Sequence, residues 1–192
     1  SFPIINAEVG IAFGKFHVKE HCRNSRLLLR SFSAGRAYNC VPDLCTAVLT
    51  VGADFLPDAK KYMLTKDKID NLEYTFEGNT LTLTTYGKSA HGSVPELGIN
   101  AAYNMLRLLG GLYACAEEEN DFVSYGLQWF VGDTKGVRVG VACSDAQTGD
   151  LSLNVGMVEY SDATKSGFYS FDIRVPVTKS VKTVEEGLKR FA

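Results

Sequence analysis

Regular spacing of apolar residues predicts most of the secondary structure in the first half of the chain. Residues 26–33 and 44–52 are rich in apolar and β-branched side chains, as strands usually are, and a turn-like segment separates them. Residues 72–87 alternate apolar and polar side chains on both sides of Gly78 and Asn79, a pair that favours a tight turn. The pattern therefore predicts two strands followed by a β-hairpin.

Two helices are expected between and after these strands. The first covers residues 55–69 and follows Pro57, a residue common in the first turn of helices. The second is expected to begin at a capping box, because Ser93 and Glu96 have the S-x-x-E spacing and Pro95 lies in the first turn. Apolar residues then recur with helical spacing at Ile99, Ala102, Leu106, Leu109 and Tyr113.

The second half of the chain follows a similar plan. The acidic run at residues 117–121 is expected to open a helix, because carboxylates near a helix N-terminus interact favourably with the helix dipole. Strands are expected at 151–160 and 167–177. A final amphipathic helix carries Val181, Val184, Leu188 and Phe191 on one face. We therefore expect an α+β fold made of two similar lobes of antiparallel sheet packed by helices, that is, two ferredoxin-like halves.

This plan also predicts the domain organisation. Residues 23–116 would form the first lobe, residues 117–192 the second lobe, and residues 1–22 a leader that precedes both. The chain begins without the features of a signal peptide and stops inside a helical pattern without a stop signal. We therefore expect a segment of a longer polypeptide, and leave open whether the second lobe is complete.

Composition argues against a nucleic-acid-binding protein and against a membrane-spanning helix. The chain has 192 residues, 45% hydrophobic content and a net charge of −2, without a basic stripe that would attract nucleic acid. It has no apolar run near the roughly 20 residues of a membrane-spanning helix. The irregular spacing of the cysteines favours free, mostly buried thiols and a reducing, cytoplasmic location, although a Cys40–Cys45 pair stays open. The cysteines are Cys22, Cys40, Cys45, Cys115 and Cys143.

Three polar residues are candidates for a functional site, although each also has an ordinary structural explanation. His91 lies between the hairpin and the second helix, where glycines and capping residues already account for a loop. Arg174 alternates with apolar residues in its strand, so we expect it to be exposed on the face away from the core. Asn39 lies in a turn, where asparagine is common. The His17 and His21 pair lies in a strand-like stretch, which argues against a shared metal ion.

The segment GKSAHGSVPELGINAA, which contains His91, closely resembles the lid motif G-x-x-A-H-[GS]-x-x-P-x-x-G-x-N-A. This motif belongs to the dinuclear zinc peptidases of the aminoacylase, carboxypeptidase G and dipeptidase V superfamily. Further segments are similar to the branch that contains dipeptidase V and the Xaa-His dipeptidases. They are FPIINAEVG, GRAYNCVPD, GDLSLNVGMVEY and FDIRVPV. The resemblance spans nearly the whole chain.

The resemblance implies a lid of two lobes, inserted into a catalytic domain that holds two zinc ions. The leader would then be a remnant of the connection to that domain. By resemblance, His91 donates a hydrogen bond to the substrate carbonyl oxygen as it becomes an oxyanion. Asn39 holds the substrate near its C-terminal end, and Arg174 binds the α-carboxylate of a dipeptide or short peptide. The stretch 33–35 departs from the glycine pair that is usual before the Asn39 turn.

The metal ligands and the general base of such an enzyme would lie in flanking sequence. This chain alone is therefore predicted to bind no zinc and to be inactive, with the catalytic domain of the same polypeptide and a peptide substrate as its partners. Two alternatives stay open: a non-catalytic α/β module for dimerisation or interaction, and the lid of a related aminoacylase or deacylase.

Overall fold

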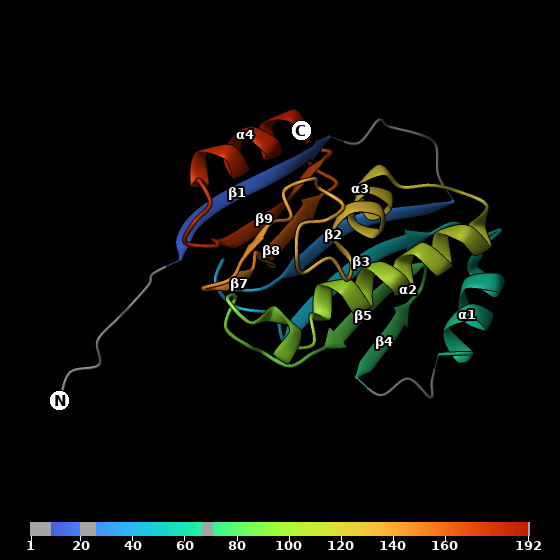
Figure 1. Cartoon of the computed structure of the whole chain (residues 1–192). Coiled ribbons are helices and arrows are strands. Elements are labelled where there is room, and N and C mark those ends of the chain that lie inside the picture. The colour runs from blue at the N-terminus through green and yellow to red at the C-terminus, as the bar shows by residue number, and fades with distance from the viewer. Residues whose placement is uncertain (1–8, 20–25, 67–70, 192) are drawn as a thin grey trace.

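A seven-stranded antiparallel sheet forms the centre of the computed structural model, which describes residues 9–19, 26–66 and 71–191 (Figure 1). The strand order is β1-β9-β8-β2-β3-β5-β4. The strands are β1 (Gly10–Lys19), β2 (Leu27–Ala34), β3 (Leu44–Val51), β4 (Leu72–Glu77), β5 (Thr80–Tyr86), β8 (Ser152–Ser161) and β9 (Ser166–Val175). A separate small ribbon pairs β6 (Ser144–Asp145) with β7 (Gly149–Asp150). The α+β class with a large antiparallel sheet is thus confirmed.

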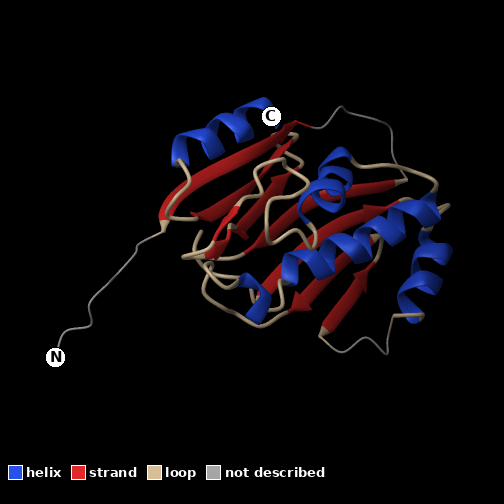
Figure 2. Ribbon diagram, viewed as in Figure 1, coloured by secondary structure: helices blue, strands red, loops and turns tan. Residues whose placement is uncertain are grey.

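Helices lie against one face of this sheet (Figure 2). They are α1 (Leu56–Leu64), α2 (Ala101–Ala116), α3 (Asp121–Tyr125) and α4 (Val181–Phe191), with a 3₁₀ turn η1 (Pro95–Leu97) and a π-helical turn η2 (Gly126–Phe130). The longest, α2, buries most of its apolar side chains against β2, β3 and β5. None of the helices in the described ranges combines the length and the apolarity needed to cross a membrane.

Successive side chains of a strand point to opposite faces of the sheet, so the apolar and the charged residues of β9 lie on different faces. On β9 the ring of Tyr169 is fully buried and stacks on Phe122 of α3, with ring centroids 4.8 Å apart. Ile173 is buried on the same side. Asp172 and Arg174 alternate with these residues and therefore face the side opposite α2 and α3. The sequence correctly predicted that Arg174 points away from the helix-covered core.

The strands of the two expected lobes join into one continuous sheet. Residues of β2 and β8 pair directly, with Ser31 opposite Ser161 and Ala34 opposite Val158. The strand β1, which falls within the predicted leader, pairs with β9 along its whole length from Gly10 to Lys19. The boundaries proposed at residues 22 and 116 stay a prediction. The rest of the leader lies outside the described residues, apart from Val9.

The expected capping box at Ser93 is wrong. The S-x-x-E segment forms only the 3₁₀ turn η1, and Gly98 then continues as extended backbone with φ −100° and ψ 174°. Ile99 and Lys88 exchange two backbone hydrogen bonds of 2.9 Å, so Ile99 belongs to a β-bridge instead of the helix. The helix α2 begins at Ala101, and Asn100 is its N-cap. Long-range pairing of the backbone therefore overrides the local capping signal.

The strands predicted at 26–33, 44–52, 151–160 and 167–177 agree with β2, β3, β8 and β9 within two residues at each end. Gly78 turns the β4–β5 hairpin with a φ of 61°, a conformation that glycine adopts without strain. The predicted helix at 55–69 ends earlier, at Leu64, and residues 67–70 lie outside the described chain. The acidic run opens a helix only at its end: Glu117 is the C-cap of α2, whereas Asn120 caps α3 and Asp121 is its first residue.

The cysteines of the described chain are free, as expected, but fewer of them are buried than predicted. Cys45 is buried, Cys40 and Cys143 are partly exposed, and Cys115 is exposed. Cys40 and Cys45 therefore form no disulfide.

Candidate functional site

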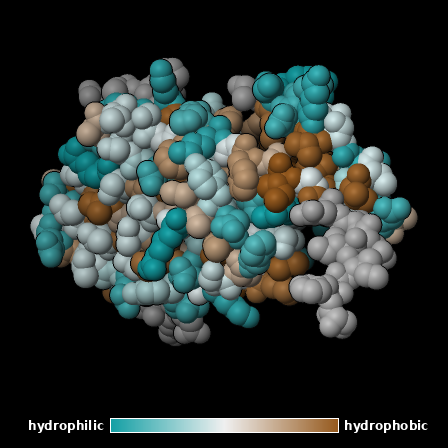
Figure 3. Space-filling model, turned by 90° about the vertical axis from the view of Figure 1, so that its left-hand side faces the viewer, coloured by the Kyte–Doolittle hydropathy of each residue, from teal (hydrophilic) through white to brown (hydrophobic). Residues whose placement is uncertain are grey.

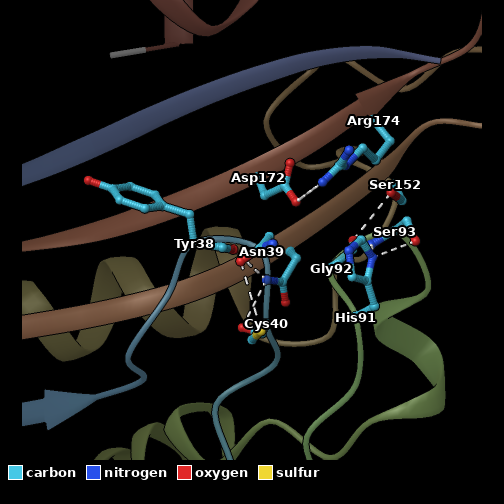
Figure 4. A network of polar contacts seen from close by, with 10 residues as sticks. Tyr38, Asn39, Cys40, His91, Gly92, Ser93, Ser152, Asp172 and Arg174 are labelled. Carbon is cyan, nitrogen blue, oxygen red and sulfur yellow. Dashed lines mark hydrogen bonds and ion pairs between the residues drawn. The ribbon is translucent and has the colours of Figure 1, made fainter. Parts of the chain in front are cut away.

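Two loops meet over the face of the sheet that is opposite α2 and α3 (Figure 4). One loop contains Asn39 and the other contains His91. Their backbones pair: the N–H of Gly92 donates to the carbonyl oxygen of Asn39 at 2.7 Å, and the N–H of Val41 donates to Ala90 at 2.9 Å. An isolated β-bridge between Cys40 and His91 lies between these two hydrogen bonds. The two loops are therefore held together as one unit.

Side chains of β8 fix this unit to the sheet. The amide nitrogen of Asn154, a residue only 2% exposed, donates to the carbonyl oxygens of Tyr38 at 2.8 Å and Cys40 at 3.1 Å. The hydroxyl of Ser152 lies 3.5 Å from the carbonyl oxygen of Gly92. A buried amide whose two N–H groups are both satisfied stabilises the position of the loop that it holds.

Arg174 and Asp172 of β9 form an ion pair beneath the loops (Figure 4). The Nη2 and Nε atoms of Arg174 lie 2.9 and 3.3 Å from Oδ2 of Asp172. The Asp172 side chain is fully buried, whereas the Arg174 side chain retains 16% exposure. The expectation of an exposed arginine is therefore wrong: the side chain does leave the core, but the loops and the carboxylate cover most of it.

Gly92 brings the His91 loop close to both the ion pair and the Asn39 loop. A β-carbon at this position would lie 2.9 Å from Oδ2 of Asp172 and 3.1 Å from the Cα of Asn39. Only a glycine allows the His91 loop to approach both groups without displacing one of them. The residues Asn39, His91, Gly92, Asp172 and Arg174 are called the two-loop site below.

His91 lies at the exposed edge of the two-loop site and is held by its neighbour Ser93. Its Nδ1 atom is 2.8 Å from the Ser93 hydroxyl and accepts the Ser93 backbone N–H at 3.2 Å. A backbone N–H can only donate, so Nδ1 must be the acceptor. The neutral ring then carries its proton on Nε2. The imidazole therefore presents an N–H donor at the end of the ring that faces away from Ser93.

The structure thus brings together the three residues predicted from the sequence. Asn39, His91 and Arg174 come from three separate parts of the chain, and Gly92 and Asp172 connect them. The side chains of Asn39 and His91 are exposed. Sequence reasoning missed Gly92, Asn154 and Ser152 as supports. The sequence indicated Asp172 only as an acid on the same strand face that could pair with Arg174, and the structure contains this ion pair.

The described residues offer no group of three or more histidine, cysteine or acidic side chains that could hold a metal ion. His17 is a strand residue of β1, as its sequence context predicted, and its ring lies 6.1 Å from that of Phe168. Its proposed partner His21 lies outside the described residues.

The fold and the two-loop site define an α+β domain with a polar, loop-built surface on one face of an antiparallel sheet. The chain belongs to the family described as "Peptidase dimerisation domain", which it matches over residues 76–191. This membership agrees with the resemblance found in the motif around His91.

Several bacterial proteins with dipeptidase names are similar to this chain. "Putative dipeptidase YtjP" of Bacillus subtilis is 32% identical over 189 residues, which cover 96% of this chain and 40% of the relative. A "Putative dipeptidase" of Staphylococcus epidermidis is 29% identical, covering 91% of this chain and 38% of the relative. One of Staphylococcus saprophyticus is also 29% identical, covering 99% and 40%. The chain therefore spans about 40% of the length of these relatives.

Proposed function

We propose that this chain is the lid and substrate-binding domain of a longer metal-dependent dipeptidase. The observation that carries the proposal is the convergence of Asn39, His91 and Arg174: backbone hydrogen bonds hold the Asn39 and His91 loops together, and Gly92 packs closely against the Asp172–Arg174 ion pair. The family membership and the names of the relatives support a peptidase as the parent protein. In this proposal the domain closes over the active site, excludes water and supplies polar groups to a dipeptide or short peptide.

Arg174 is proposed to bind the α-carboxylate of the substrate. Asp172 occupies the Nε and Nη2 atoms of the guanidinium, and no hydrogen bond of Nη1 is found among the described residues. A guanidinium has five N–H donors, so a second carboxylate can bind at the edge formed by Nη1 and Nη2. Recognition of a free C-terminus by a fixed group restricts cleavage to short peptides. Asn39, on the adjacent exposed loop, is proposed to hold the substrate near the same end.

His91 is proposed to donate from Nε2 to the carbonyl oxygen of the scissile peptide bond. Water addition turns that oxygen into an oxyanion, and a preorganised donor stabilises the negative charge as it develops. The tautomer imposed by Ser93 leaves the required proton on Nε2. The exposed position of the ring allows it to reach a substrate held between this domain and another one.

The metal ions that the resemblance implies are proposed to lie in the part of the full-length protein outside this chain. They would be two zinc ions, and such ions activate water and polarise carbonyl groups in hydrolases. The described residues form no cluster that could hold them. The free cysteines favour, in the same proposal, a cytoplasmic parent protein.

The surface around the site is suited to contact with another domain. Ile11 and Phe13 of β1 are 45% and 60% exposed, and Phe13 pairs in register with Asp172 on the same face. Its ring lies 5.9 Å from that of Tyr38, next to Asn39. Figure 3 shows apolar residues gathered in patches among polar ones on the face that it draws. Large exposed apolar side chains commonly mark surfaces that another domain covers.

A second candidate function is pairing of two subunits, which the description of the matched family favours. Among the described strands, the ten-residue β1 lies at one edge of the sheet and could pair with a second copy. Analytical ultracentrifugation of the full-length protein decides this point. A dimer that a proline in β1 converts to a monomer would support pairing through this strand, whereas a wild-type monomer would exclude it.

The experiment that tests the lid proposal uses the full-length protein and matched peptides with free and amidated C-termini. Arg174→Lys is preferable to alanine, because it keeps a positive partner for the buried Asp172. We expect the preference for the free C-terminus, measured as a ratio of kcat/KM values, to fall about 10- to 100-fold, the range of one charge-assisted hydrogen bond. Arg30→Lys is the matched control, since Arg30 pairs with Asp162 on an exposed part of the sheet.

His91→Ala in the same protein should lower kcat by roughly 10²–10³, the usual cost of one oxyanion donor, with a smaller change in KM. The amount of bound metal should not change, because His91 is proposed as a donor and not as a ligand. A variant with wild-type kcat, or with lost metal, would refute the oxyanion role. An unchanged ratio in Arg174→Lys would refute the carboxylate role.

A further inference from the structure

Asp172 has an unusual environment for a charged side chain. It is fully buried, and its Oδ2 atom contacts two nitrogens of Arg174. Its Oδ1 atom is also buried, and no hydrogen-bond donor for it is found among the described residues. A buried carboxylate with an unsatisfied oxygen is costly for folding, so its presence needs a reason other than stability.

The polar neighbours of Asp172 are engaged elsewhere. Asn154, its register partner on β8, uses its amide nitrogen for the carbonyl oxygens of Tyr38 and Cys40. Ser170, two residues earlier on the same face, accepts the backbone N–H of Met157. The register partner on β1 is the apolar Phe13. Within the described chain, Arg174 is therefore the group that neutralises Asp172.

The contact between Asp172 and Arg174 involves one particular edge of the guanidinium. Asp172 binds it through Nε and Nη2, the side edge, and both contacts converge on the single oxygen Oδ2. This arrangement fixes the plane of the guanidinium, and no hydrogen bond of Nη1 is found among the described residues. An arginine without this contact would lose that orientation, because its side chain has several freely rotating bonds.

We propose that Asp172 is the positioning residue of Arg174: its buried carboxylate orients the guanidinium so that the outer edge receives the substrate's carboxylate. The inference rests on the proposed function, and it deepens that proposal by assigning a role to a residue outside the predicted site. Gly92 completes the arrangement, because its missing side chain leaves Oδ2 accessible to Arg174 while the His91 loop passes nearby. The orientation of Arg174 and the position of the His91 loop therefore both depend on the contact between Asp172 and Gly92.

The first test measures the orientation of Arg174 directly in this chain by NMR of the arginine Nε–H groups. In Asp172→Asn we expect exchange of the Arg174 Nε–H with solvent to accelerate about 10- to 100-fold, the range of one lost charge-assisted hydrogen bond. Arg30 is the internal control, because its Nε donates to Thr50 and its Nη1 pairs with Asp162. Asp162→Asn should leave the Arg174 signal unchanged. Unchanged exchange of Arg174 in a folded Asp172→Asn protein overturns the inference.

The second test measures substrate recognition in the full-length protein. Asp172→Asn should raise KM about tenfold for peptides with a free C-terminus, change kcat less than twofold, and leave amidated peptides unaffected. A general structural defect would instead lower kcat for both kinds of peptide, which would overturn the inference. If Asp172→Asn does not fold, Asp172→Glu keeps the charge, displaces it by one methylene and is expected to show the same selective rise in KM.

The two proposals fail in different ways. If Arg174→Lys loses the preference for a free C-terminus while Asp172→Asn keeps it, the positioning role is wrong and the proposed function stands. If neither variant loses the preference, the carboxylate role of Arg174 is wrong, and the inference about Asp172 falls with it.

Discussion

The start of α2 offers the sharpest test of how the His91 segment is held. Asn100 caps this helix: its Oδ1 accepts the backbone N–H groups of Ala102 at 3.0 Å and Tyr103 at 3.3 Å. Its Nδ2 also donates to the carbonyl oxygen of Val155 at 3.0 Å, at the irregular point of β8. One side chain therefore ties the end of the His91 segment both to the helix and to the sheet. Asn100→Ala removes both connections.

The expected loss of stability follows from the hydrogen bonds that Asn100→Ala removes. Removal of an N-cap costs about 0.5–2 kcal/mol, and a lost hydrogen bond to a buried carbonyl costs about 0.5–1.5 kcal/mol. We therefore expect the free energy of unfolding to fall by roughly 2 kcal/mol. In a domain of this size that corresponds to a decrease in Tm of about 4–8 °C. Urea and thermal unfolding followed by circular dichroism measure both quantities on this chain.

Ser93→Ala is the matched control, because the sequence pattern assigns the cap to Ser93. In the structure Ser93 is exposed, and among the described residues its hydroxyl hydrogen-bonds only the His91 ring, so its removal should change stability by less than about 0.5 kcal/mol. The argument is refuted if Ser93→Ala destabilises the chain as much as Asn100→Ala does. A loss below about 0.5 kcal/mol for Asn100→Ala would refute it equally.

Two further properties can be checked on the same chain. Hydrogen bonds from the backbone N–H groups and hydroxyls of Thr178 and Thr148 hold the pKa of Asp145 well below its usual range. A lowered pKa stabilises the fold above the unfolded-state value near about 4, and this contribution disappears on acidification. Asp145→Asn should therefore be less stable than wild type at pH 7, with a difference that shrinks as the pH falls below about 4; a constant difference would contradict this. Burial raises the pKa of the Cys45 thiol, whereas Cys115 is exposed. Labelling at pH 8 followed by mass spectrometry should modify Cys115 first and Cys45 only on unfolding, and early labelling of Cys45 would show that the core opens in the native state.

The sequence determined the local elements well, because their signals depend on neighbouring residues only. The alternation in β4 and β5 and the turn at Gly78 are period-two and turn-type patterns that a short segment encodes by itself. The alternation along β9 also placed Arg174 on the face away from the core. The family motif around His91 also indicated the loop that lies at the exposed edge of the two-loop site.

Tertiary structure alone decided how these elements combine. Pairing between β2 and β8 joins residues more than a hundred positions apart into one sheet, and no local pattern specifies such a partner. The true start of α2 depends on the bridge between Lys88 and Ile99 and on the contact of Asn100 with Val155. A capping motif contributes only about 1 kcal/mol, so long-range hydrogen bonds can override it.

Long-range packing also explains why the sequence alone did not show the arrangement of the two-loop site. The sequence indicated Asn39, His91 and Arg174 separately, and each had an ordinary explanation in its own segment. Their proximity arises because the loops pair through Gly92 and rest on β8 and β9. The burial of Asp172 beneath them follows from this packing as well. Distances between residues remote in sequence are set by the whole sheet, which is why only the folded structure reveals them.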